Sequence, residues 1–325
     1  MKTDANSQFS IDNLKFAYKM ALAFGTVIIL LVVLAVEGIR ALDGARSHFI
    51  DYRSMARETN ISGRLQANLL EARVNALKYI RTGDASSQSN FRQRIDQLKQ
   101  LIEQAGDQIT DEQRLLVVKA VAADINSYDQ AFEQIVAFKE TRNQLVDKLN
   151  TIGPEIPNLL DQIIDGSLRS NQQTQSYKAT QLKNDLLIAR LHVIKFLEDN
   201  SEQSVNNFSD AFGDFEQGLA TLRKSTSGTN GRQLQQIVSL AADYKTSFDQ
   251  LTDTIFSRND VIAQQLDSIG PKVAKSLEDI KLAVKQQQDI LGPQIQENSY
   301  DAIVKLAVIT IVIILLSILI TILFS

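Results

Sequence analysis

Four arginines are the residues of this 325-residue chain whose surroundings point to chemistry. Arg142 and Arg258 fall within series of apolar residues that recur every three or four positions, and Arg73 and Arg190 each stand one position beside such a series. A guanidinium aimed at an apolar core needs an anionic partner or a wet cavity. Two converging guanidinium groups match a small carboxylate in bidentate geometry. The arginines are therefore candidate ligands for a small organic acid.

The same arginines also fit a purely structural role, in which nearby carboxylates neutralise them while their aliphatic stems pack against the core. Carboxylates that could do so are Glu71, Glu140, Asp253 and Asp260. Neutral side chains that could add hydrogen bonds to a bound acid are Asn75, Asn143, His192, Asn259 and Gln264.

Other chemistries find little support in the sequence. His48 and His192 are the only histidines and stand far apart, there is no cysteine, and no glycine-rich phosphate loop or metal-ligand spacing occurs. The net charge of −4 argues against a nucleic-acid partner. We therefore expect neither enzymatic activity nor a metal or cofactor.

Two apolar runs bracket the chain. Residues 20–36 and 306–324 carry no charge, and their 17 and 19 residues are each about long enough to cross a bilayer core as a helix. Lys2, Lys15 and Lys19 flank the first run, and positive flanks stay in the cytoplasm. The large segment between the runs should therefore lie outside the cytoplasm.

The first run is predicted to be a retained anchor rather than a signal peptide, because no small-residue cleavage site follows Val36. The expected organisation is a cytoplasmic tail at 1–19, a transmembrane helix at 20–39, a periplasmic domain at 40–301 and a second transmembrane helix at 302–325.

The segment between the two runs is predicted to be entirely helical. Its apolar residues recur at spacings of three and four, and no alternating strand pattern is found. Two such stretches, 121–163 and 237–277, are far longer than an average helix. Ile-Gly-Pro occurs within both long patterns, at 152–154 and 269–271, and is interpreted as a kink or bulge rather than a binding loop. Turns are predicted at residues 82–84, 106–107, 199–201 and 227–231.

The two halves of this segment form an internal repeat. A Leu-Leu-x-x-Arg segment of the first half recurs 117 residues later in the second half. Further along, matching residues are 116 apart. After one inserted residue in the second half, they are again 117 apart. The matched pairs are 69–73 with 186–190, Tyr128 with Tyr244, Phe132 with Phe248, Arg142 with Arg258, and 149–154 with 266–271. One medium, one short and one long helix are thus used twice.

This repeat predicts an all-α fold of two four-helix bundles stacked end to end, with six helices, of which two long ones are shared. From the helix rise, Arg73 should lie level with Arg258 in the lower bundle, and Arg190 level with Arg142 in the upper one. Each bundle would then hold one pair of arginines.

The chain resembles the sensory part of bacterial transmembrane chemoreceptors. The repeat, the Leu-Leu-x-x-Arg segments and the paired Ile-Gly-Pro elements are similar to those of the helical bimodular sensory domain, over essentially all of 40–301. The resemblance implies a homodimer that binds dicarboxylates such as malate or succinate in the membrane-proximal module and acetate in the distal one. One such receptor has a second arginine where Leu69 and Leu70 stand here, which leaves the ligand open.

The expected binding sets combine this resemblance with the neighbouring polar residues. The proximal set is Arg73, Asn75, Arg258 and Gln264, and the distal set is Arg190, His192 and Arg142.

The sequence therefore predicts a two-pass protein of the bacterial inner membrane that senses small organic acids and passes a signal through its second span. Three alternatives stay open: a sensor-kinase input domain, a module that binds a periplasmic protein, and a structural spacer. The signal-relay segments that would tell a chemoreceptor from a kinase are not among residues 1–325.

Overall fold

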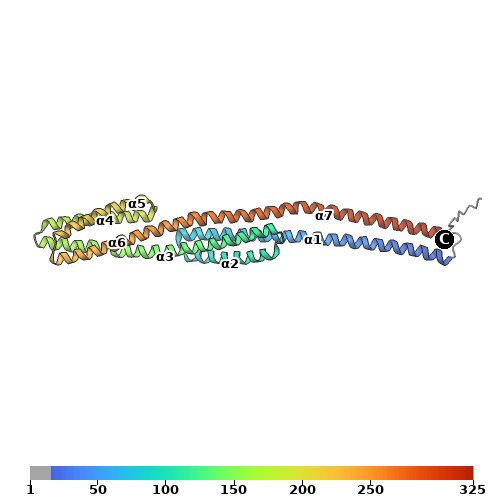
Figure 1. Cartoon of the computed structure of the whole chain (residues 1–325), viewed down its shortest axis with the longest axis horizontal. Helices are drawn as coiled ribbons and strands as arrows, with labels where there is room; N and C mark the ends of the chain where they lie inside the picture. The colour runs from blue at the N-terminus through green and yellow to red at the C-terminus, as the bar shows by residue number, and fades with distance from the viewer. Residues whose placement is uncertain (1–15, 325) are drawn as a thin grey trace, which may run out of the picture. The chain divides into compact units, whose positions relative to one another are not determined.

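A computed structural model describes residues 16–324, and the predicted cytoplasmic tail lies mostly outside them. The described residues are almost entirely helical and contain no strand, which confirms the predicted all-α class (Figure 1). The elements are α1 (Phe16–Thr82), α2 (Ala85–Gln108), α3 (Glu112–Arg169), α4 (Gln173–Asp199), α5 (Glu202–Lys224), α6 (Gly228–Val261), the π-helix η2 (Ile262–Leu266) and α7 (Asp267–Phe324).

Two of the turns are related by the repeat. Gly83 directly follows α1 with φ +71° and Asn200 directly follows α4 with φ +51°, a left-handed conformation that commonly terminates helices. The next residue caps the following helix in each case. Asp84 Oδ1 accepts the Ser87 backbone N–H at 2.8 Å, and Ser201 Oγ accepts the Ser204 N–H at 3.1 Å. The turn predicted at 106–107 is wrong, since α2 continues to Gln108.

The one-residue insertion between the repeats takes the form of η2. α6, η2 and α7 follow one another without a gap, and the π-turn accommodates the extra residue where the shift between repeats changes from 116 to 117. The bulge expected near the second Ile-Gly-Pro therefore lies just before it. At the first Ile-Gly-Pro, α3 continues as a single α-helix that includes Pro154 and Pro157.

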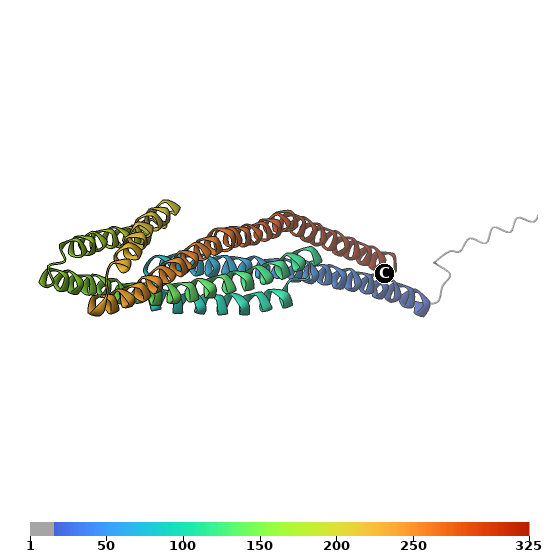
Figure 2. The same ribbon diagram turned by 60° about the vertical axis from the view of Figure 1, so that its left-hand side comes forward.

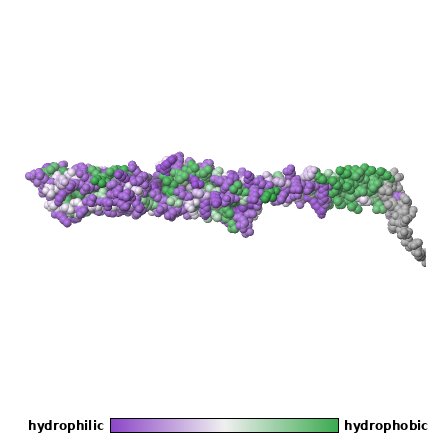
Figure 3. Space-filling model, turned by 90° about the horizontal axis from the view of Figure 1, so that it is seen from above, coloured by the Kyte–Doolittle hydropathy of each residue, from purple (hydrophilic) through white to green (hydrophobic). Residues whose placement is uncertain are grey.

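The chain divides into two compact units. The first unit comprises residues 1–67, 100–119 and 275–325. It contains two helices long and apolar enough to cross a membrane, the ends of α1 and α7. These ends form a continuous hydrophobic surface in Figure 3. Where that surface ends, Lys305 Nζ donates to Glu37 Oε2 at 2.7 Å.

A buried ion pair lies in the helical part of the first unit. Glu58 of α1 is 1% exposed, and its Oε2 lies 3.0 Å from Nε of Arg114 at the start of α3. Burial raises the pKa of Glu58, although the Arg114 charge opposes this shift. The buried position of Glu58 therefore disfavours the charged form of its carboxylate.

The second unit, residues 68–99 and 120–274, contains a core to which four helices contribute. Buried apolar residues of α3, α4, α5 and α6 form one cluster, and α4 and α5 lie side by side (Figures 1 and 2). The rings of Phe208 and Phe248 in this cluster have centroids 3.8 Å apart. Their repeat equivalents Phe91 and Phe132, from α2 and α3, have centroids 3.7 Å apart, and the ring of Tyr79 from α1 lies 5.3 Å from that of Phe132. The repeat thus extends to the packing of the core.

Candidate ligand-binding sites

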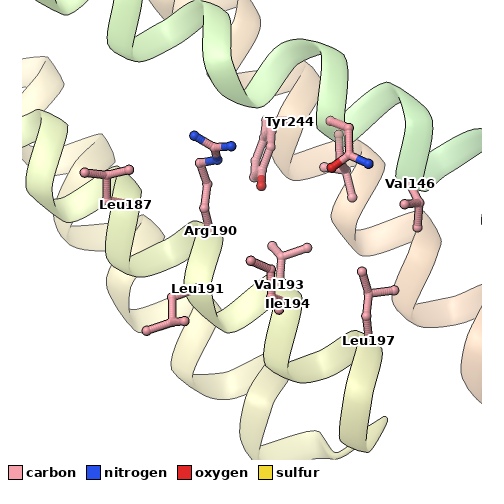
Figure 4. Close-up of a pocket in the computed structure, with 10 residues that line it drawn as sticks. Val146, Leu187, Arg190, Leu191, Val193, Ile194, Leu197 and Tyr244 are labelled. Carbon is pink, nitrogen blue, oxygen red and sulfur yellow. The ribbon is translucent and has the colours of Figure 1, made fainter.

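Arg190 lies at a cavity of about 320 Å³ in the second unit. α4 supplies Arg190, α6 supplies the buried Tyr244, and α3 supplies Asn150, as the close-up in Figure 4 shows for the first two. The remaining walls are apolar, and one side is open to solvent. The other lining residues are Val146, Leu149, Leu187, Leu191, Val193, Ile194 and Leu197.

The electrostatics of this cavity favour an anion. No residue among 17–322 forms an ion pair with Arg190 within 4 Å, so the structural alternative of a neutralised arginine does not apply to it. Burial raises the pKa of Tyr244 to about 12, against the opposing charge of Arg190. The phenol therefore stays protonated near neutral pH and can donate a hydrogen bond to a carboxylate.

Gly153 makes room for the Arg190 side chain. A Cβ at this position would lie 3.0 Å from Arg190 Nε and 3.3 Å from Tyr244 Cε2. The glycine of the first Ile-Gly-Pro thus allows a guanidinium from α4 to approach α3 closely, which its interpretation as a kink or bulge did not predict. We call Arg190, Tyr244 and Gly153 the Arg190 site.

An equivalent constellation surrounds Arg73, and we call Arg73, Tyr128 and Gly270 the Arg73 site. A Cβ at Gly270 would lie 2.8 Å from Arg73 Nε and 3.4 Å from Tyr128 Cε2. Burial raises the pKa of Tyr128 to about 12, and the charge of Arg73 again opposes the shift. Glu71, which could have neutralised Arg73, instead forms an ion pair with Arg94.

Each site combines residues of both repeats. In the Arg73 site the arginine and tyrosine belong to the first repeat and the glycine to the second, whereas the Arg190 site has the reverse composition. The tyrosines and glycines were absent from the predicted sets. Their signal was present in the sequence, because the repeat pairs Tyr128 with Tyr244 and Gly153 with Gly270.

The predicted pairing of the arginines is not found. Arg258 Nη2 donates to Asn200 Oδ1 at 2.8 Å. Gly270, which contacts Arg73, lies twelve residues beyond Arg258, about 18 Å along the helix. The arithmetic of helix rise placed Arg258 level with Arg73 of α1, whereas Arg258 contacts Asn200 in the turn at the end of α4.

The other predicted ligands are also dispersed. Asn75 Nδ2 donates to the Glu71 backbone oxygen of its own helix at 2.8 Å, and Gln264 is exposed within η2. His192 does not line the cavity of the Arg190 site, and its buried Nδ1 has no hydrogen-bond partner within the described part of the chain. No described contact places Asn75, Gln264 or His192 next to one of the four arginines.

Comparison with known proteins agrees with this architecture. A family model described as a helical bimodular sensor domain matches residues 52–290. The match includes both arginine sites and both repeats. No curated protein matches the chain.

Proposed function

Because the chain belongs to the helical bimodular sensor domain family, we propose that it is the ligand-sensing region of a bacterial transmembrane chemoreceptor that binds small organic acids. The observation that carries this proposal is Arg190, a cation with no described ion-pair partner that lines a cavity with otherwise mostly apolar walls. No catalytic role is proposed for any residue.

The cavity indicates the class of ligand. Its volume of about 320 Å³ corresponds to roughly ten water molecules at about 30 Å³ each, which suits a small carboxylic acid. The Arg190 fork would hold the carboxylate, with further hydrogen bonds from the Tyr244 hydroxyl and the Asn150 amide. The apolar walls would contact a short alkyl group. This chemistry favours a monocarboxylate such as acetate at the Arg190 site.

The Arg73 site offers the same three residue types and supports a second acid, for which the family resemblance suggests a dicarboxylate. Gly270 of this site belongs to α7, and α7 continues into the second apolar end. A ligand that repositions Arg73 would therefore act directly on the helix that crosses the membrane. The signal is limited by the difference in ligand affinity between the two states of that helix.

The proposal is tested by calorimetry on the full chain in lipid nanodiscs, titrated with acetate, propionate, succinate and malate. At least one acid should bind, and Arg190→Gln or Arg73→Gln should weaken that binding at least tenfold. Arg92→Gln is the matched control, because Arg92 pairs with Glu133 at 2.7 Å on an exposed surface. The absence of binding by all four acids, or equal binding by all variants, would refute the proposed sites.

The two apolar ends support insertion in the bacterial inner membrane, with the sensor domain in the periplasm. A sensor-kinase input domain would use the same binding chemistry. The two are distinguished by the output, which for a chemoreceptor is a change in swimming behaviour on addition of the acid.

An exposed apolar stripe supports a homodimer. Leu70, Val74 and Leu77 of α1 are each more than half exposed, and the repeat-equivalent residues of α4 are also exposed. Their spacing of four and three places them along one helix face, as in coiled-coil interfaces. The α4 residues are Leu187, Leu191 and Ile194, and all three line the open cavity. A second copy packed there would cover that cavity.

The same stripe favours a protein-binding module as the second candidate function, because contiguous apolar patches mark interaction sites. Sedimentation of the full chain in detergent separates the two. A dimer supports self-association, whereas a monomer that captures a periplasmic binding protein supports the alternative.

A further inference from the structure

The cavity of the Arg190 site lies along two antiparallel helices whose register is fixed. α3 and α4 are joined by the short turn at 170–172. Near that turn, Lys183 Nζ of α4 donates to Asp161 Oδ1 of α3 at 2.7 Å. Further along, a Cβ at Gly153 of α3 would lie 3.0 Å from Arg190 Nε of α4. Each step along α4 is thus matched by an equal step back along α3.

This register gives the cavity a far end. Leu197 lies seven residues beyond Arg190 on α4, Val146 lies seven residues before Gly153 on α3, and both line the cavity. Seven residues correspond to about 10 Å along a helix. Figure 4 shows Val146 and Leu197 on the same side of the cavity, away from Arg190. The cavity therefore extends from the guanidinium towards these two residues, which we call the apolar end.

The polar groups of the cavity are gathered near its arginine. Among the described residues that line it, Arg190, Tyr244 and Asn150 are polar, and all the others are Leu, Ile or Val. A Cβ at Gly153 would lie 3.3 Å from Tyr244 Cε2, which places this ring beside the arginine, and Asn150 is one helical turn from Gly153. A polar group at the apolar end would lose contacts with water and gain no hydrogen bond in exchange. An alkyl group there would gain from burial.

Acetate is small for a cavity of this shape. If each non-hydrogen atom takes up about 30 Å³, as a water molecule does, acetate fills less than half of the cavity volume of about 320 Å³. By the same measure hexanoate, with twice as many such atoms, fills most of it. A carboxylate held by Arg190 would leave the tail of hexanoate directed along α4 towards Leu197.

We propose that the Arg190 site prefers an amphipathic monocarboxylate, with an unbranched alkyl tail of about five carbon atoms, over acetate. Arg190 and Tyr244 would hold the carboxylate, and Val146 and Leu197 would contact the end of the tail. This inference rests on the proposed function, because it uses the same arginine. It adds the length and the polarity of the ligand, and it excludes a second carboxylate at the apolar end.

The expected gain follows from the burial of methylene groups. One fully buried methylene group strengthens binding by about fourfold. Hexanoate has four more methylene groups than acetate, but the cavity is open to solvent on one side, so each of them is only partly buried. We therefore expect hexanoate to bind at least about tenfold more tightly than acetate.

Calorimetry on the full chain in lipid nanodiscs tests this preference with acetate, butyrate, hexanoate and adipate, and empty nanodiscs serve as the blank for uptake by lipid. Affinity should rise from acetate through butyrate to hexanoate. Adipate has the chain length of hexanoate but carries a second carboxylate, so it should bind at least about tenfold more weakly than hexanoate. Arg190→Gln should weaken the binding of hexanoate and of acetate alike.

A variant at the apolar end locates the tail. Val146→Phe fills this end of the cavity, so it should reduce the affinity for hexanoate to about that for acetate and leave acetate binding unchanged. Retained acetate binding then shows that the variant is folded. Leu168→Phe is the matched control, because Leu168 lies on the same helix at an exposed position outside the cavity, and it should bind both acids as the wild type does.

The outcomes separate this inference from the proposed function. If acetate binds and depends on Arg190, but affinity does not rise with chain length, the inference is overturned and the proposed function stands. Adipate binding as tightly as hexanoate, or equal effects of Val146→Phe and Leu168→Phe on hexanoate, would also overturn it. Absence of binding by all four acids would refute the ligand site itself.

Discussion

The substitution Gly153→Ala should strengthen a helix and weaken the proposed ligand binding at the Arg190 site. Gly153 lies inside α3, where alanine is about 1 kcal/mol more favourable than glycine. The added Cβ would lie 3.0 Å from Arg190 Nε, which must then move by a few tenths of an ångström. We therefore expect the melting temperature to rise by about 2–4 °C for a unit of this size.

Binding should change in the opposite direction. A hydrogen bond to a charged group contributes about 1.5–3 kcal/mol, and about 1.4 kcal/mol corresponds to a factor of ten in affinity. If the shifted guanidinium loses one such bond, the acid held at the Arg190 site should bind about 10–100-fold more weakly, as calorimetry on the full chain would show.

Gly213→Ala is the matched control for this experiment. Gly213 also lies inside a helix, α5, but a Cβ there would meet no atom within 4 Å. It should give a similar rise in melting temperature with unchanged affinity. If Gly153→Ala binds the acid as tightly as the wild type does, the role assigned to the glycine is wrong. If it melts below Gly213→Ala, α3 moves instead of Arg190.

Three further predictions concern the buried ion pair, the π-helix and the apolar stripe. Burial raises the pKa of Glu58 above 4.5, so the folded state binds the carboxyl proton more tightly than the unfolded state does. The free energy of unfolding should therefore fall as the pH rises from about 4.5 towards the folded pKa. Thermal melts of Glu58→Gln should lack this pH-dependent part of the stability. Deleting Gln264 should convert η2 into an α-turn, and circular dichroism should still show cooperative melting. Deleting Lys148 from α3 instead turns the following residues by about 100° around the helix axis, which should abolish cooperative melting. Leu191→Lys should dissociate a dimer in sedimentation experiments, while Leu168→Lys, at an exposed residue outside the stripe, should not.

The repeat is the part of the structure that the sequence predicts best. Matching Leu-Leu-x-x-Arg segments identified Arg73 and Arg190, and both arginines lie in equivalent surroundings. The apolar spacing predicted the helices, and glycine or polar residues marked the turns after α1 and α4, whereas the turn predicted at 227–231 falls mostly within α6. These features depend on local periodicity, which a single sequence contains.

The contacts between helices could not be predicted in the same way. Glycine followed by proline usually interrupts a helix, so the sequence at 152–154 predicts a kink or bulge, whereas the glycine accommodates Arg190 of a helix distant in sequence. Arg258 was assigned to the wrong partner because its contact, Asn200, depends on where the turn after α4 meets α6. The change of shift from 116 to 117 was visible, but only the structure shows that a π-turn accommodates it.

The mixed composition of the two arginine sites bears on how such a chain can arise by gene duplication. A polypeptide with a single repeat would carry the arginine and tyrosine of one site and the glycine of the other. Two such polypeptides, related by a twofold axis, would complete two identical sites, whereas one alone would complete neither. Fusion into one chain makes this association permanent and lets the residues around each arginine diverge separately.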